Sequence, residues 1–240
     1  MPNCIPGSPQ YWKSFGLDLI AMTQTRGLPD FFVTLSVNDA WPHVQATIRD
    51  GWGAAEKVQS INLAEPVIDR QPAGGHPDVC VMAAEERFQW FMNTYLRSKK
   101  GGPLGKVVDY VWKKEYQKRG AVHWHMLLWI EPGTIPDDAV VAEMPRPADS
   151  NSAVGKYLRR MVRKLETHDY CTPKCFQKAF GQTSDKCKYG FPYNVPQEVE
   201  ELDEDNTRYL YPRRHEEDRM VVPHNLEMLV VWGAGTTCSV

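Results

Sequence analysis

His123 and His125 stand one residue apart in the apolar run AVHWHMLLWI (121–130), which has the composition of a buried strand. Side chains alternate between the two faces of a strand. One face of this run is uniformly apolar and is expected to pack against helices, while both histidines project from the other face. Two such imidazoles can bind a divalent metal ion, although a bare His-x-His pair is more often only a polar surface.

The strand before these histidines is expected to add a carboxylate. The residues KRG (118–120) suit a three-residue hairpin loop, which commonly ends in a left-handed conformation that glycine adopts without strain. Such a loop places Glu115 opposite His123 and Lys113 opposite His125, and cross-strand partners point to the same face. Two imidazoles and a carboxylate would then suit a divalent ion with open coordination positions. A two-residue loop would turn Glu115 to the other face.

A second set of candidate ligands lies in the segment HDYCTPKCFQKAFGQTSDKC (168–187), where His168, Cys171, Cys175 and Cys187 are spaced as H-x2-C-x3-C-x11-C. Three thiolates and one imidazole can complete a tetrahedral zinc site, although cysteines are also common as buried free thiols. Zinc here would be structural and would pin a loop-rich insertion. Six cysteines in the whole chain are too few for a disulfide scaffold.

The elements that would position these groups predict an α+β fold, with a mostly antiparallel central sheet and helices on one face. Strands are expected at 31–38, 106–117 and 121–130, and helices at 9–26, 40–51, 83–100 and 152–165. Loops are expected at 60–80 and 132–151, and a strand or turn followed by a short helix at 220–232. If strand 31–38 is adjacent to the histidine strand, its Thr34, Ser36 and Asn38 line the same floor.

Charge and hydropathy exclude some functions. The formal net charge of −2 does not by itself indicate a nucleic-acid-binding protein, so the distribution of charge matters more. The chain lacks a run of 18 apolar residues and a secretory signal, so an intracellular protein outside the membrane is expected. Trp129, on the histidine face, can stack on a single-stranded base. The candidate phosphate contacts lie on the basic helix and are Lys156, Arg159, Arg160, Arg163 and Lys164.

Four segments, in this order, resemble the N-terminal Rep-like region of Helitron transposases, which are HUH endonucleases. They are GSPQYWKSFGLDLIAMTQTRGLPDFFVTLSVNDAWP (7–42), KEYQKRGAVHWHMLLW (114–129), THDYCTPKCF…CKYGFP (167–192) and VVPHN (221–225). The pair of histidines around one hydrophobic residue is the signature of the HUH enzymes. The resemblance implies a Rep-like fold whose relatives carry a fused helicase domain and act in the nucleus.

This resemblance implies metal-dependent nicking and joining of single-stranded DNA. The histidine pair and a third polar ligand would hold Mg²⁺ or Mn²⁺, and a tyrosine would attack phosphorus to give a 5′-phosphotyrosine and a free 3′-OH. His123 and His125 match the metal histidines, and Glu115 and Gln117 match an E-x-Q before the turn. We prefer Glu115 as third ligand because charge and hairpin geometry favour it, with Gln117 as the alternative.

The nucleophile departs from the pattern of the resemblance. The tyrosines of that family follow a VVPYN region, and the corresponding VVPHN stands at 221–225, so they are expected beyond Val240. Tyr157 is a weaker candidate, because most tyrosines on amphipathic helices are packing residues and the position one turn on is Met161. Two other functions stay open: an inactive, zinc-stabilised DNA-binding remnant, and a metal-dependent hydrolase that activates water at the same histidines.

The expected organisation has three parts. Residues 1–165 form the Rep-like nuclease core, with the metal half of its site on 106–130. Residues 166–197 form the Cys/His zinc-binding segment. Residues 198–240 hold an acidic loop and the start of the C-terminal part of the Rep region, which is expected to be truncated.

Overall fold

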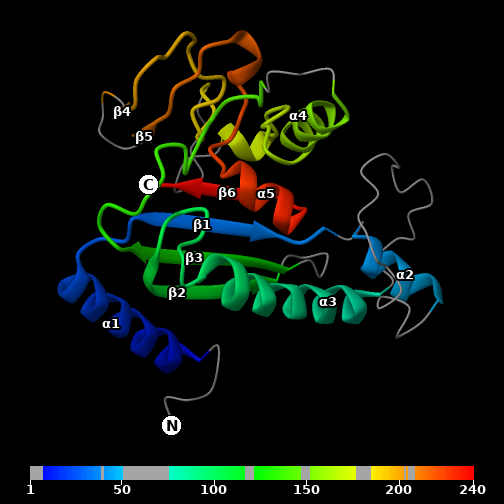
Figure 1. Cartoon of the computed structure of the whole chain (residues 1–240). Helices are drawn as coiled ribbons and strands as arrows, with labels where there is room; N and C mark the ends of the chain where they lie inside the picture. Colours follow the sequence, from blue (N-terminus) through cyan, green and yellow to red (C-terminus); the bar gives the residue numbers. More distant parts are fainter. Residues whose placement is uncertain are drawn as a thin grey trace.

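The computed structural model describes residues 8–38, 41–50, 76–116, 122–146, 152–176, 185–202, 204 and 209–240. Its centre is a four-stranded antiparallel sheet with the order β2-β3-β1-β6, so the last strand of the chain lies beside the first (Figure 1). The strands are β1 (Phe31–Ser36), β2 (Val107–Tyr116), β3 (Val122–Ile130) and β6 (Thr236–Ser239). A separate two-stranded ladder pairs β4 (Glu201–Leu202) with β5 (Tyr209–Leu210).

Helices accompany this sheet, which confirms the predicted α+β class. The α-helices are α1 (Pro9–Arg26), α2 (Pro42–Asp50), α3 (Pro77–Trp90), α4 (Ala153–Leu165) and α5 (Leu226–Trp232). Helix α3 continues as the π-helix η3 (Phe91–Leu96), and the short 3-10 turns are η4 (Pro173–Phe176) and η6 (Glu216–Asp218). Within the described ranges, every helix is too short or too polar to cross a lipid bilayer.

The core lies on the face of the sheet that the alternation predicted to be apolar. Trp124 of β3 is fully buried and stacks on Phe88 of α3, with ring centroids 4.6 Å apart and an interplanar angle of 8°. Trp232 of α5 meets the same tryptophan edge-on at 6.1 Å. Large aromatic rings bury much apolar surface, so these contacts fix α3 and α5 on one face of the sheet.

The end of α5 is clamped by a residue of α3. Gly233 ends α5 in the left-handed conformation, with φ of 75°. Arg87 donates from Nε to the carbonyl oxygen of Trp232 at 2.9 Å and from Nη2 to that of Val231 at 2.6 Å. These carbonyls have no partner inside the helix, so the guanidinium satisfies them and joins the two helices.

Two elements, α3 and β6, differ from the sequence predictions. Helix α3 begins at Pro77, so part of the expected loop 60–80 is helical. Helix α1 has the predicted bounds but buries none of its residues, because it packs at the periphery. Strand β6 was not predicted, since TTCS (236–239) is short and its pairing partner lies near the other end of the chain.

Candidate functional site

The hairpin strands pair as the sequence predicted. β2 and β3 are antiparallel, with Glu115 opposite His123 and Lys113 opposite His125. The carboxylate and both imidazoles therefore share one face, opposite the buried core. The loop, residues 117–121, lies outside the described residues. It includes Gln117, the alternative third ligand.

Strand β1 adds hydroxyl groups to this face. It pairs with the other side of β3 and places Thr34 opposite His125 and Ser36 opposite His123. Thr34 Oγ1 lies 3.0 Å from His125 Nδ1, and Glu115 Oε2 lies 3.2 Å from His125 Nε2. Both ring nitrogens of His125 are thus held by neighbouring strands. We name His123, His125, Glu115 and Thr34 the histidine row.

The histidine row offers the donors that a divalent ion requires, in an open arrangement. In the tautomer whose Nδ1–H donates a hydrogen bond to Thr34 Oγ1, the lone pair of Nε2 is directed toward Glu115. The side chains of His125 and Glu115 are 29% and 55% exposed, so a ligand reaches them from solvent. The ring centroids of His123 and His125 are 6.4 Å apart, which is wider than in a closed metal site.

Trp129 shares a face with His125 but is not accessible to DNA. Its side chain is 2% exposed, and its Nε1 donates to the carbonyl oxygen of Gly27 at 3.0 Å. The end of α1 covers this part of the sheet, where Arg26 Nε lies 2.7 Å from Asp109 Oδ2. The predicted stacking of a base on Trp129 does not fit this burial.

The four Cys/His ligands come together in space, and we name them the Cys/His cluster. His168 Nε2 lies 3.3 Å from Cys171 Sγ and 3.7 Å from the Sγ atoms of Cys175 and Cys187. Zinc bonds of about 2.3 Å to sulfur and about 2.1 Å to nitrogen, at tetrahedral angles, separate these atoms by about 3.6 Å. All four ligand atoms lie within 4.8 Å of one another, so the cluster can hold a metal ion.

The Cys/His cluster rests on loops rather than on the sheet. Phe191 stacks on the His168 ring with centroids 4.7 Å apart, and Lys188 N donates to the carbonyl oxygen of Cys175 at 2.7 Å. The segment joins the rest of the chain where His168 N donates to the carbonyl oxygen of Met220 at 2.8 Å. Apart from the single turn η4, no helix or strand among the described residues carries a ligand of the cluster.

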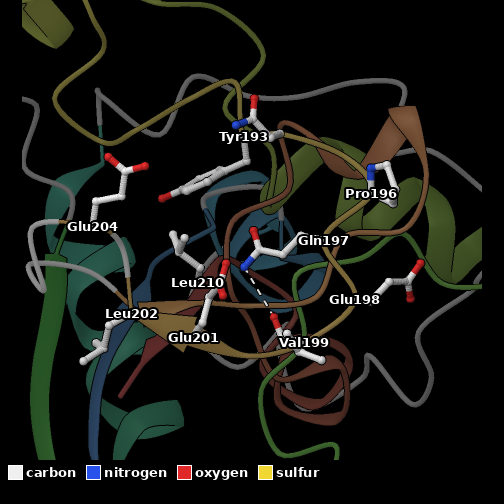
Figure 2. Close-up of a pocket in the computed structure, with 10 residues that line it drawn as sticks. Tyr193, Pro196, Gln197, Glu198, Val199, Glu201, Leu202, Glu204 and Leu210 are labelled. Carbon is white, nitrogen blue, oxygen red and sulfur yellow. Dashed lines mark hydrogen bonds between the residues drawn. The ribbon is translucent and has the colours of Figure 1, made fainter.

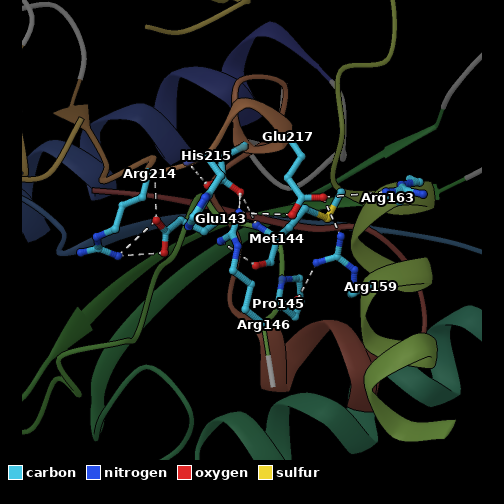
Figure 3. A network of polar contacts seen from close by, with 10 residues as sticks. Glu143, Met144, Pro145, Arg146, Arg159, Arg163, Arg214, His215 and Glu217 are labelled. Atoms are coloured by element: carbon cyan, nitrogen blue, oxygen red, sulfur yellow. Dashed lines mark hydrogen bonds and ion pairs between the residues drawn. The ribbon is translucent and has the colours of Figure 1, made fainter. Parts of the chain in front are cut away.

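The basic residues of α4 divide into two groups. Arg159 points into the protein, where its Nη2 lies 2.6 Å from Glu217 Oε2 and its Nη1 donates to the carbonyl oxygen of Pro145 (Figure 3). The Arg159 guanidinium is thus engaged in an internal ion pair, and its contact with a phosphate stays a prediction. The exposed basic residues of the helix are Lys156, Arg160, Arg163 and Lys164.

A buried carboxylate anchors this network, and it was not predicted. Asp218 is fully buried and accepts hydrogen bonds from Arg146 Nη2 at 2.7 Å, Met144 N at 2.8 Å and His215 N at 2.9 Å. A buried charge needs such partners, so Asp218 fixes segment 141–146 against η6. The adjacent basic and acidic residues in RRHEEDR (213–219) indicate ion pairing but not the partners, which lie on 141–146 and α4.

Tyr157 lies on α4 and is half-buried. Burial raises the pKa of its phenol above the ordinary value, and Arg160 opposes this effect. The Arg160 guanidinium lies 5.8 Å from the ring centroid. A phenol that holds its proton more tightly is a weaker nucleophile at neutral pH, unless a neighbouring base removes the proton.

Two cavities lie away from the histidine row. One, of about 610 Å³, has an acidic rim that includes Glu198, Glu201 and Glu204 (Figure 2). The other, of about 440 Å³, lies beside the Asp218 network and is lined by Arg146, Arg214 and His224, among others. The guanidiniums of Arg146 and Arg214 are paired with carboxylates, so neither cavity presents uncompensated positive charge.

Comparison with known proteins gives one match. A family model described as the Helitron helicase-like domain at the N-terminus matches residues 1–128, which include β1, β2 and most of β3. Searches of curated proteins and of solved structures give no match.

Proposed function

Because this chain belongs to the Helitron helicase-like N-terminal domain family, we propose that it binds single-stranded DNA and a divalent metal ion to nick and join DNA strands. Membership of the family supports a transposase-family role and an interaction with nucleic acid. The observation that carries the finer proposal is that Glu115, His123 and His125 share one face of the sheet, where Glu115 Oε2 lies 3.2 Å from His125 Nε2. A nuclear location belongs to the same proposal.

Mg²⁺ or Mn²⁺ is the ion that we propose for the histidine row. His123 and His125 would provide nitrogen ligands and Glu115 an oxygen ligand, while the hydrogen bond from His125 Nδ1 to Thr34 Oγ1 would hold the His125 ring in place. When bound, such an ion polarises a phosphodiester and stabilises the charge that develops on its oxygens. The row keeps a solvent-facing side, so a DNA phosphate can approach.

The remaining parts would hold and shape this site. We propose that the Cys/His cluster binds structural Zn²⁺, because its donors and their separations fit a closed tetrahedron. The exposed basic residues of α4 would contact phosphates without reading sequence. In this division, residues 1–165 form the nuclease core, 166–197 the zinc segment and 198–240 the acidic and C-terminal part.

The attacking tyrosine is the open part of the proposal. Tyr157 is a candidate within this chain, but its half-buried position and raised pKa do not favour attack. This observation supports a second function, in which the domain binds DNA and metal without forming the covalent bond. Activation of a metal-bound water is a third possibility, and it would not depend on any tyrosine.

A cleavage assay with labelled single-stranded DNA and Mn²⁺, resolved on a denaturing protein gel, separates these functions. We would compare the wild type with His123→Ala/His125→Ala and with Tyr157→Phe. A covalent protein–DNA band that both variants lose supports nicking through Tyr157. Mn²⁺ and DNA binding without that band supports the binding function, and histidine-dependent cleavage that Tyr157→Phe retains supports hydrolysis. Failure of wild type to bind either Mn²⁺ or DNA contradicts the proposal.

A further inference from the structure

An aromatic ring lies beside the histidine row and has no role in the core. Phe31 and Phe32 are adjacent in β1, but they point to opposite faces of the sheet. Phe31 is 3% exposed and packs in the core, whereas Phe32 is 44% exposed on the face of the histidines. Leaving this much of a phenylalanine in water forgoes a large part of its burial energy.

The orientation of Phe32 connects it to His125. The two rings are nearly parallel, with an interplanar angle of 8° and centroids 5.7 Å apart. A base stacks against an aromatic ring at van der Waals distance, and this ring adjoins His125, so it lies within reach of a nucleotide whose phosphate is held there. Such a distance suits contact with the base of the bound nucleotide or of its neighbour.

The surroundings of Phe32 favour a nucleobase over a protein side chain. Thr34 follows it on the same face of β1, and its cross-strand neighbours are Ser239 on β6 and Leu127 on β3, so the ring rises from a floor that is polar on one side and apolar on the other. Lys113, opposite His125 on β2, adds a cation on the far side of the row, where its Nζ lies 4.6 Å from the centroid of the Trp12 ring. An aromatic platform next to polar and cationic groups is typical of surfaces that bind single-stranded nucleic acid.

We propose that Phe32 is the stacking platform for a base next to the phosphate at the histidine row. This inference rests on the proposed function, since it places the DNA strand on the same face. Stacking tolerates every base, so Phe32 would position the strand and would not select its sequence. Phe32 would thus provide the base stacking that was predicted for Trp129, which is buried.

The test uses the whole chain with Mn²⁺ and thymidine oligonucleotides that carry one 2-aminopurine, moved along the strand. Binding to wild type should quench the fluorescence at one or two adjacent positions. Phe32→Leu should abolish this quenching and weaken binding by about fivefold to one-hundredfold. Phe32→Trp should retain both. Trp90→Leu, at an aromatic residue 48% exposed on α3, is the matched control and should change neither.

Mn²⁺ affinity separates stacking from a structural role. Phe32→Leu should bind Mn²⁺ as wild type does, and a loss of metal affinity would overturn the proposal by showing that the ring mainly supports His125. Unchanged quenching in Phe32→Leu would overturn the stacking role and leave the proposed function standing. If the wild type bound none of the oligonucleotides, the proposed function would fail and this inference with it.

Discussion

The Cys/His cluster and the histidine row gather metal-binding side chains in opposite ways. In the cluster, four ligand atoms lie within 4.8 Å of one another, two cysteines are buried, and the supporting backbone is mostly loop. In the row, the ligands stand on paired strands, the rings of His123 and His125 are 6.4 Å apart, and solvent reaches them. The first arrangement is closed and the second is open.

This difference indicates whether the ion holds the protein in place or the protein holds the ion. The ligands of the Cys/His cluster lie mostly on loops, so a bound ion would hold the loops. The sheet is held by its ladders and by the core behind it, so the strands would hold the ion at the histidine row. A closed site suits a structural ion, and an open site suits an ion that must also meet a substrate.

Removing a cluster ligand should give the largest effect. We expect Cys175→Ser to lose the zinc that we propose for the cluster and to unfold the described loops around it, because structural zinc contributes about 10 kcal/mol in small zinc-dependent peptides. Metal content and hydrogen exchange of these loops measure the two losses. Cys80→Ala, at a buried cysteine outside the cluster, is the control and should keep its metal. If wild type purified without metal showed the same protection as the loaded protein, the loops would not depend on an ion.

The stability of the fold at low pH limits the pH range in which the two sites can be compared. Burial lowers the pKa of His224 to about 4, from 6.5. Below pH 6.5 the unfolded chain therefore binds a proton at this residue that the folded chain does not bind until about pH 4. We expect this residue alone to remove about 3 kcal/mol of folding free energy as the pH falls through that window.

Denaturant unfolding at several pH values measures this loss. His224→Asn should be less stable at pH 7, because the smaller side chain does not fill the buried site of the imidazole. Its stability should depend less on pH between 4 and 6.5. The exposed His76 provides a control, and His76→Gln should keep the wild-type slope. An unchanged slope in His224→Asn would contradict the prediction.

The orientation of His125 gives a smaller and more specific effect. Thr34→Val keeps the shape of the side chain but removes the hydroxyl that contacts His125 Nδ1. Loss of a partner of this kind commonly weakens metal binding by about 10- to 100-fold, so we expect that loss in Mn²⁺ affinity with the fold intact. Thr237→Val, directly opposite Thr34 on β6, is the control. Equal losses in both variants would mean that the row responds to packing and not to this hydrogen bond.

The smallest effect should come from α4, and it distinguishes DNA contacts from internal ion pairs. Lys156→Ala removes an exposed cation, so we expect weaker binding of single-stranded DNA and a salt-dependence slope reduced by about 0.7. Arg159→Ala breaks the ion pair with Glu217 and should lower the melting temperature instead. Binding isotherms at several salt concentrations and a thermal melt measure the two effects. An unchanged salt slope in Lys156→Ala would remove this lysine from the DNA interface.

Sequence reasoning was most successful where local rules decide the geometry. Strand alternation and the length of one hairpin loop were sufficient to place Glu115 opposite His123. The spacing of His168 and the three cysteines likewise predicted a group that the structure brings together. Both sets depend on residues that are near one another in the chain, where few alternative arrangements exist.

The features that the local sequence did not reveal involve contacts between distant segments. The burial of Trp129 depends on Gly27, and the ion pair of Arg159 depends on Glu217. Neither partner can be identified from the residues around the predicted site. Phe32 is a different case, because its face was predicted correctly but its exposure depends on what the other elements leave uncovered.

The pairing of β1 with β6 bears on how the protein is synthesised. Leu35 pairs with Thr236, so this contact closes a loop of 236 − 35 = 201 residues. Contacts this distant in sequence slow folding, and strand β1 leaves the ribosome long before its partner does. Until then one edge of β1 presents unpaired backbone groups, and such edges promote aggregation. Chaperones that shield nascent strands should therefore raise the yield of this protein more than they raise that of proteins with sequential strand pairing.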